Sequence, residues 1–242
     1  MVDLEIIRNK VKELEKETTD KIKIVEKLQE INECFLQNYI IKIYKLEIYP
    51  VEVESYYYNY NKIDKKLIFD DGLCHKNELQ NGFVDNSEER KRFGKIYFHR
   101  RSPSKDCKIN TGYGGIDICL SLGDYFLSIL IRSAYINNKM ECGINKILQR
   151  VLEIKRWTKV DEKLERKYKD IENEENVLKQ RDYKIYNSFI SHPRIKNNEY
   201  FKDNKYLLNT FAFDELKNLK NNFYTQKRKN EIRDKYKPQT IN

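Results

Sequence analysis

Two glutamates lie two residues apart in a segment that alternates apolar and polar side chains, Val51-Glu52-Val53-Glu54-Ser55. A β-strand places both carboxylates on one face and both valines on the other, because successive side chains point to opposite sides. A carboxylate is a candidate general base. The alternation alone favours an edge strand with its valines on the core and its glutamates in water.

Two further charges lie inside apolar runs, Asp117 within residues 116–120 and Arg132 within residues 129–132. An unpaired buried ion is very costly, so each charge must pair, leave the sheet or serve a site. One arrangement brings Asp117, Arg132 and Glu54 together in a polar pocket lined by tyrosines. The alternative is a structural ion pair between Asp117 and Arg132.

Other patterns that carry chemistry are sparse. Three histidines occur, His75, His99 and His192, each beside turn or strand-end residues. The sequence contains no phosphate loop, dinucleotide fingerprint or serine-histidine-acid triad. Its five cysteines are odd in number, far apart and never spaced C-x-x-C. This pattern predicts reduced thiols rather than a disulfide framework or a zinc site, and we expect neither a metal nor a cofactor.

The elements that must position these residues follow from hydrophobic periodicity. Helical spacing runs through residues 4–35, with an interruption near Thr18-Thr19-Asp20 that is suited to cap a second helix. Residues 38–60 are crowded with β-branched and aromatic side chains, which predicts two strands turning near Tyr49-Pro50. Residues 61–93 are polar and contain glycine turn signals, so we expect a long loop.

Three short apolar runs, 95–100, 114–122 and 126–135, suit further strands. Helical spacing returns from 144 to about 186, as one helix or two. Such a helix covers the sheet or pairs with the N-terminal helix, and a coiled-coil dimer is the alternative. We therefore predict an α+β fold with a curved, mostly antiparallel sheet and flanking N-terminal, central and C-terminal helices. Its expected parts are a helical extension (1–35), an α+β core (36–213) and a basic tail (214–242).

The totals constrain partner and location. The 47 Lys+Arg exceed the 38 Asp+Glu and give a net charge of +9, which favours a polyanion such as nucleic acid. The basic tail is either a phosphate-contacting arm or a solvated terminal helix. No apolar run approaches the roughly 20 residues that span a bilayer, and the N-terminus lacks the pattern of an export signal. We expect no membrane partner, and a cytoplasmic location or a nuclear one.

In their order, several of these stretches resemble the motifs of alkyladenine DNA glycosylases. That family has a valine-glutamate-x-glutamate-x-tyrosine strand, a histidine loop, a tyrosine-rich strand after glycine and, further on, a leucine-x-arginine-alanine strand. The corresponding stretches are residues 36–41 (LQNYII), 51–56 (VEVESY), 74–75 (CH), 94–99 (GKIYFH), 116–118 (IDI), 130–134 (LIRSA), and 193–195 (PRI) ahead of 206–208 (YLL).

Carried over by position, the resemblance implies two catalytic residues. Glu54 would be the general base that deprotonates a water, and Arg132 would keep Glu54 ionised and position that water. The base-binding residues that the resemblance implies are Tyr56, His75, Tyr97, His99 and Asp117. His99 takes the place of a second pocket tyrosine, and Asp117 that of an asparagine. Contacts to the nucleic-acid backbone are expected from Arg100, Arg101, Lys105 and Arg194.

The function that the resemblance implies is that of a monofunctional DNA glycosylase, an N-glycosidic hydrolase acting on a flipped base by water attack. It requires Glu54 and Arg132 to meet beside an aromatic-walled cavity of nucleobase size. DNA is the expected partner. Two alternatives stay open: a non-catalytic nucleic-acid-binding module on the same scaffold, and a hydrolase of small nucleosides that needs no basic track.

Overall fold

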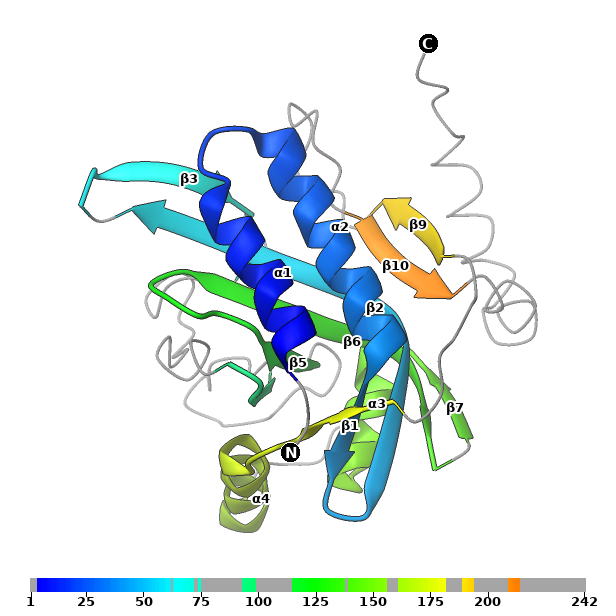
Figure 1. Cartoon of the computed structure of the whole chain (residues 1–242). Coiled ribbons are helices and arrows are strands. Elements are labelled where there is room, and N and C mark those ends of the chain that lie inside the picture. The colour runs from blue at the N-terminus through cyan, green and yellow to red at the C-terminus, as the bar shows by residue number, and fades with distance from the viewer. Residues whose placement is uncertain are drawn as a thin grey trace.

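The structure, a computed structural model, describes residues 4–61, 63–71, 74, 93–98, 115–137, 139–155 and 161–181, and the backbone of 189–193 and 209–213. Within these ranges four helices flank a curled antiparallel sheet, so the predicted α+β class is confirmed (Figure 1). The main path through the sheet runs β4-β5-β6-β2-β1-β8.

The longest strand, β2 (Leu46–Asn61), has partners along both of its edges. One edge pairs with β6 (Phe126–Ile136) from Ile48 to Tyr58. Along the other edge three strands follow one another: β1 (Tyr39–Ile43), β10 (Asn209–Phe213) and β3 (Lys66–Asp70). Because β2 joins all of these strands, its side chains lie at the centre of the sheet.

The remaining strands extend the sheet outward from β6, β1 and β10. On the far edge of β6 lie β5 (Ile116–Cys119), which in turn pairs with β4 (Ile96–Phe98), and β7 (Lys139–Cys142). On the other side β8 (Leu178–Gln180) pairs with β1, and β9 (Phe189–Pro193) pairs with β10. The apolar runs at 95–100 and 114–122 thus contain β4 and β5, and the run at 126–135 forms β6 up to its last residue, Ile136, as predicted.

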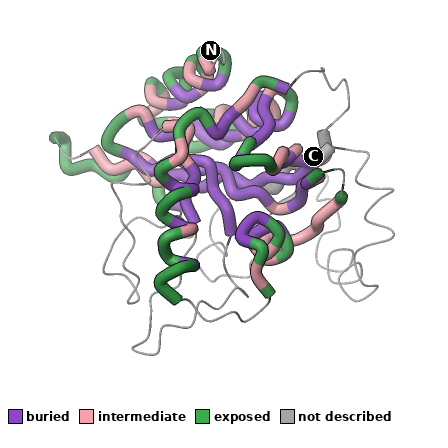
Figure 2. Tube along the Cα trace, turned by 90° about the horizontal axis from the view of Figure 1, so that it is seen from below, coloured by how far each residue is buried: buried purple, intermediate pink, exposed green. Residues whose placement is uncertain are grey.

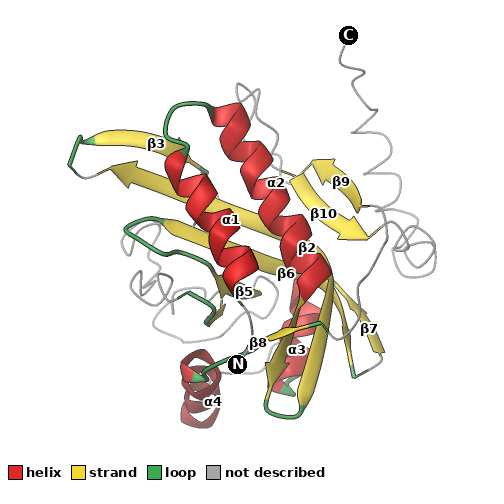
Figure 3. Cartoon of the chain, in the orientation of Figure 1, coloured by secondary structure: helices red, strands yellow, loops and turns green. Residues whose placement is uncertain are grey.

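Two N-terminal helices cover one face of this sheet. The helices α1 (Glu5–Lys16) and α2 (Lys21–Asn38) lie side by side across β2 and β6 (Figures 1 and 3). Their predicted apolar stripe is buried in one continuous core with Val53 of β2 and Ile131 of β6. Figure 2 shows the same burial along the strands and on the inner sides of the helices. Burial of this shared stripe, rather than helix propensity, is what holds the pair on the sheet.

The predicted interruption between the two helices is confirmed. Asp20 is the N-cap of α2, and its carboxylate accepts from the backbone N–H groups of Ile22 at 2.9 Å and Lys23 at 3.2 Å. The first N–H groups of a helix have no intrahelical partner, so these two bonds stabilise the start of α2.

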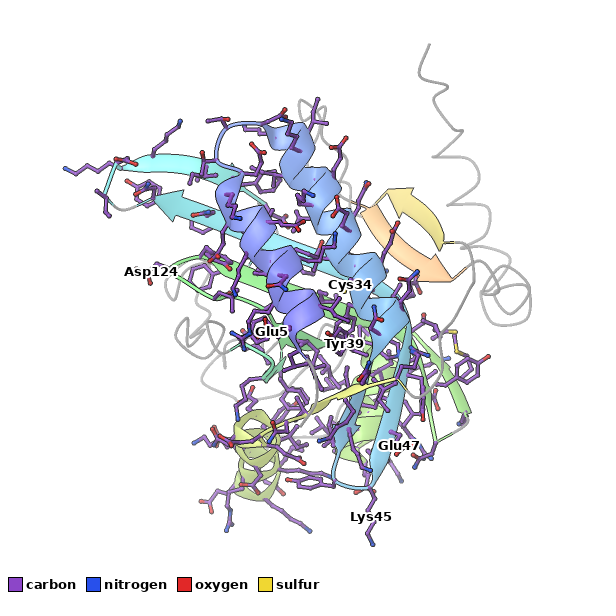
Figure 4. All side chains as sticks on the ribbon, viewed as in Figure 1. Glu5, Cys34, Tyr39, Lys45, Glu47 and Asp124 are labelled. Carbon is purple, nitrogen blue, oxygen red and sulfur yellow. The ribbon has the colours of Figure 1, made fainter. Side chains whose placement is uncertain are left out.

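The predicted turn near Tyr49-Pro50 is wrong. The chain reverses at Tyr44-Lys45, where Tyr44 has φ +51°, and Figure 4 shows Lys45 at this β1–β2 turn. Pro50 lies inside β2, on an edge position between the end of the β1 pairing at Ile48 and the start of the β10 pairing at Glu52. A proline is tolerated there because neither β1 nor β10 pairs with this position, so the missing N–H of proline interrupts no strand pairing.

A side chain takes the place of a strand partner at this gap. The guanidinium of Arg181, a residue that is only 7% exposed, donates from Nη2 to the carbonyl oxygen of Pro50 at 3.1 Å. It also lies over the ring of Tyr49, 5.5 Å from its centroid. The contact satisfies a carbonyl between two pairings and links the end of β8 to the centre of β2.

The segment from 144 to about 186 differs in part from the predicted helix. It contains α3 (Ile144–Leu152), which packs on β6, and α4 (Glu162–Asn173), which packs on β4. Its end forms β8, which is paired with β1. Three residues are too few for hydrophobic periodicity to distinguish a strand from a helix. The segment forms a strand because it pairs with the edge of β1 that does not face β2. Likewise β3 lies within the stretch expected to be a loop. No described helix is both long and apolar enough to cross a bilayer.

The α2 cap gives a first prediction. Replacing Asp20 by Ala removes both side-chain hydrogen bonds and lowers the free energy of unfolding by about 1 kcal/mol. Urea denaturation of the full chain measures the loss. Asp20→Ser is the matched control, since a serine side chain also caps and retains most of the stability. Equal stability of Asp20→Ala and the parent chain would contradict the role of this cap.

Candidate active site

The sheet face opposite α1 and α2 carries the residues that the sequence singled out. Strand register aligns Glu54 of β2 with Leu130 of β6, Leu130 with Asp117 of β5, and Asp117 with Tyr97 of β4. Residues directly opposed on neighbouring strands share a face. The four side chains therefore form one row across four strands, and all four are buried.

Both carboxylate oxygens of Glu54 accept a hydrogen bond. Nη1 of Arg132 lies 2.5 Å from Oε2 of Glu54, and the hydroxyl of Tyr56 donates to Oε1 at 2.9 Å. The side chain of Glu54 is 4% exposed and that of Arg132 is 18% exposed. Charge-assisted hydrogen bonds of this kind are the strongest in proteins, so the orientation of this carboxylate is well defined.

The placement of both glutamates corrects one expectation and confirms another. Val51 and Val53 lie in the core, on the opposite side from Glu52 and Glu54, as the alternation predicts. The glutamates are not in water, however, because Glu52 is 4% and Glu54 3% exposed. Alternation reports that a strand has two different faces, but not whether the polar face is covered, and β2 is not an edge strand.

A paired irregularity in the sheet directs Arg132 toward Glu54. The β2–β6 register shifts twice, between Pro50 and Glu52 and again between Glu52 and Val53. The first shift leaves Val51 without an opposite residue, and the second leaves Arg132 without one. A β-bulge bends the strand and re-aims side chains. As a result two consecutive residues, Arg132 and Ser133, both reach carboxylates of β2.

A second carboxylate completes this cluster. Oγ of Ser133 donates to Oε2 of Glu52 at 2.5 Å, and Nε of Arg132 lies 3.9 Å from Oε1 of Glu52. Burial lowers the pKa of Arg132, but the negative charges of Glu54 and then Glu52 outweigh burial, and the pKa lies above its ordinary value. Arg132 is therefore a permanent cation between two carboxylates.

Asp117 occupies a separate position in the row. It is fully buried and accepts a hydrogen bond from Oγ of Ser128 at 2.9 Å. The ion pairs of Arg132 are with Glu54 and Glu52, so the alternative of an Asp117–Arg132 ion pair is wrong. Asp117 and Glu54 are on strands separated by β6, about 10 Å apart at two inter-strand spacings. An apolar residue, Leu130, lies between them.

Aromatic and apolar side chains surround the polar row. Tyr56, Phe126 and Leu130 form a second buried cluster with Cys74, separate from the main core. Tyr58 packs against this cluster, with its ring stacked on Phe126 at 6.3 Å between centroids. From outside the sheet, Ile144 at the start of α3 also contacts it. Through Leu130, this cluster places apolar surface between Glu54 and Asp117, and a low local dielectric strengthens electrostatic interactions.

The remaining predicted site residues lie outside the described ranges. They are His75, His99, Arg100, Arg101, Lys105 and Arg194. His192 is in β9, of which only the backbone is described. It pairs with Thr210 of β10, and Thr210 in turn pairs with Glu54 of β2. The nucleobase-sized cavity stays a prediction, as do the roles of these residues.

Two serines of the site were not found by sequence reasoning. Ser133 bonds Glu52 and Ser128 bonds Asp117. A hydroxyl beside a charged residue is too common a pattern to be informative. Only the register, and for Ser133 the bulge, decides which serine faces which carboxylate.

The described residues contain no group of three or more His, Cys, Asp or Glu side chains placed to hold a metal ion. No protein-family model matches the chain, and no curated protein matches it at a significant level.

The buried ion pair gives a second prediction. Arg132→Met leaves Glu52 and Glu54 without their cation and lowers the free energy of unfolding by about 3–5 kcal/mol, whereas the double variant Arg132→Met/Glu54→Gln recovers part of this loss. Urea denaturation of the single and double variants measures the coupling. The exposed pair Lys42–Glu47, at 3.4 Å, is the matched control, and Lys42→Met costs less than about 1 kcal/mol. Equal costs at the two sites would refute a strong buried pair.

Proposed function

We propose that this protein is a monofunctional N-glycosidic hydrolase that excises a damaged or modified base from nucleic acid, with DNA as the preferred substrate. One observation carries the proposal: a buried carboxylate, Glu54, is held between the guanidinium of Arg132 and the hydroxyl of Tyr56. The motif order that resembles alkyladenine DNA glycosylases gives Glu54 and Arg132 catalytic roles, and the contact between them supports that assignment.

The chemistry follows from the two side chains. Glu54 takes a proton from a water, whose oxygen then bonds to the anomeric carbon of the nucleotide. The glycosidic C–N bond breaks, and the base leaves with its electron pair and takes up a proton. The transition state is oxocarbenium-like, so the negative charge of Glu54 stabilises it as well as activating the water.

Arg132 has two roles in this step. Its positive charge lies against the carboxylate of Glu54, and its hydrogen bond fixes the direction in which that carboxylate faces the water. A carboxylate has about four lone-pair sites, so hydrogen bonds from Arg132 and Tyr56 are compatible with a further bond from a water. Water is the nucleophile, and no lysine amine is needed.

Recognition of the base requires that it leave the duplex. A flipped base is held by aromatic faces and by hydrogen bonds to its edge. We assign Tyr56 and His75 to the faces, and Tyr97, His99 and Asp117 to the surroundings of the base. The row of Glu54, Leu130 and Asp117 supports this assignment. It offers a base an apolar surface at Leu130, with a carboxylate on either side. The net charge of +9 suits a polyanionic substrate.

Base release gives the third prediction. The full chain is incubated with duplex and single-stranded DNA carrying alkylated, deaminated and oxidised bases, and released base is measured by chromatography. Glu54→Gln lowers the single-turnover rate by about 10²–10⁴-fold, since a general base contributes that much. The matched control is Glu47→Gln, which changes a glutamate near the N-terminal end of the same strand. This variant retains the rate of base release.

The other outcomes separate the alternatives. Salt-dependent DNA binding without release of any base would indicate a binding module. Hydrolysis of mononucleosides without affinity for DNA would indicate a small-nucleoside hydrolase. If a folded Glu54→Gln variant keeps the full rate of base release, Glu54 is not the general base.

Asp117 gives the fourth prediction, which concerns base preference. An ionised carboxylate only accepts hydrogen bonds, whereas an asparagine amide both donates and accepts. Asp117→Asn therefore changes the ratio of rates between a base with an amino group and its analogue with a carbonyl by about tenfold, the range of one good base-edge contact. The pair adenine and hypoxanthine, each with the same alkyl group where possible, measures this ratio. An unchanged ratio would place Asp117 away from the base.

A further inference from the structure

Arg132 faces two carboxylates, and only one of them is the proposed general base. Its Nη1 lies 2.5 Å from Glu54 and its Nε lies 3.9 Å from Glu52. Both glutamates are nearly fully buried. A guanidinium has five N–H donors and reaches these two carboxylates through different nitrogens, so its position depends on how each carboxylate is held.

Ser133 supplies the second donor. Its hydroxyl bonds Oε2 of Glu52 at 2.5 Å, while Oε1 of Glu52 is the atom that faces Arg132. The serine hydrogen bond thus orients Glu52 and satisfies one of its oxygens without the help of Arg132. The guanidinium of Arg132 then keeps its short contact with Glu54.

The backbone around Arg132 and Ser133 is itself fixed. The N–H of Gly143 donates to the carbonyl of Arg132 at 2.8 Å, and Ser133 pairs with Cys142 of β7. Gly143 has φ +104°, a conformation that L side chains rarely adopt, and α3 begins directly after it. The bulge is therefore held from β7 and α3, on the side opposite β2.

We propose that Glu52 and Ser133 form a positioning pair, which holds the Nε side of Arg132 so that Nη1 stays on Glu54. In catalysis this role rests on the proposed function, but the effect on Arg132 is a property of the protein without substrate. Neither Glu52 nor Ser133 touches the reacting atoms in this scheme, and both act through Arg132.

The first experiment needs no substrate. The Nε–H resonance of Arg132 is observed by ¹⁵N NMR in the labelled full chain and assigned by its loss in Arg132→Lys. In Ser133→Ala, Glu52 turns toward Arg132, and the resonance shifts and its exchange with water changes. Ser133→Thr keeps the hydroxyl and keeps the resonance near its original position. An unchanged Arg132 resonance in both Ser133→Ala and Glu52→Gln would overturn the proposal.

The control is a buried serine outside this cluster. Ser121 is fully buried, and its hydroxyl oxygen accepts from the backbone N–H of Leu127 at 2.9 Å. Ser121→Ala therefore reports what the loss of a buried hydroxyl does to stability alone. If Ser133 had a merely structural role, its Ala variant would lose stability in the same way and leave the Arg132 resonance in place.

The second experiment measures turnover on whichever base the parent chain releases. Ser133→Ala lowers kcat by about tenfold with KM within about twofold, because misplacement by 1 Å costs up to about a hundredfold in rate. Ser133→Thr restores kcat, and Ser121→Ala retains it. A kcat for Ser133→Ala equal to that of the parent chain would overturn the catalytic part of the proposal. Absence of base release by the parent chain would instead refute the proposed function, while the NMR result still decides whether Arg132 is positioned.

Discussion

Burial of Glu52, Glu54 and Arg132 at the centre of a sheet costs hydration free energy, which their ion pairs and the hydrogen bonds from Tyr56 and Ser133 offset. The contacts require β2 and β6 to meet with a defined irregularity, since Arg132 lies at a bulge and Ser133 at the next position. The ion pair is weak support for stability in itself, because an apolar replacement of the same shape is often as stable.

The rest of the fold serves this position through β2. One side of the strand packs under α1 and α2, and the other carries the polar row. Partners along both edges of β2 remove the slippage that an edge strand would allow, since a one-residue slip would exchange the two faces. Arg181 extends the support to Pro50, two residues before Glu52. The two glutamates thus lie on the strand that has the most partners in the described sheet.

Much of the fold could be predicted because it depends on local pattern. The apolar stripe of residues 4–35, the Asp20 cap and the strands around Ile96, Ile116 and Phe126 are all legible in the sequence. The turn at Tyr44-Lys45 was missed, because Pro50 looks like a turn residue until the gap between β1 and β10 is known. Strand β8 was missed for a similar reason, since a short segment takes the structure that its partner edge imposes.

The amino-acid pattern alone predicts that Glu52 and Glu54 share a face and that Asp117 and Arg132 are charges within strands, and its motifs resemble those of a glycosylase. The contacts of Arg132 with Glu54 and Glu52, and that of Asp117 with Ser128, are seen only in the folded chain. So is the burial of the glutamate face. The physical reason is that alternation is a property of one strand, whereas burial, bulges and ion-pair partners depend on which strands lie beside it and in what register.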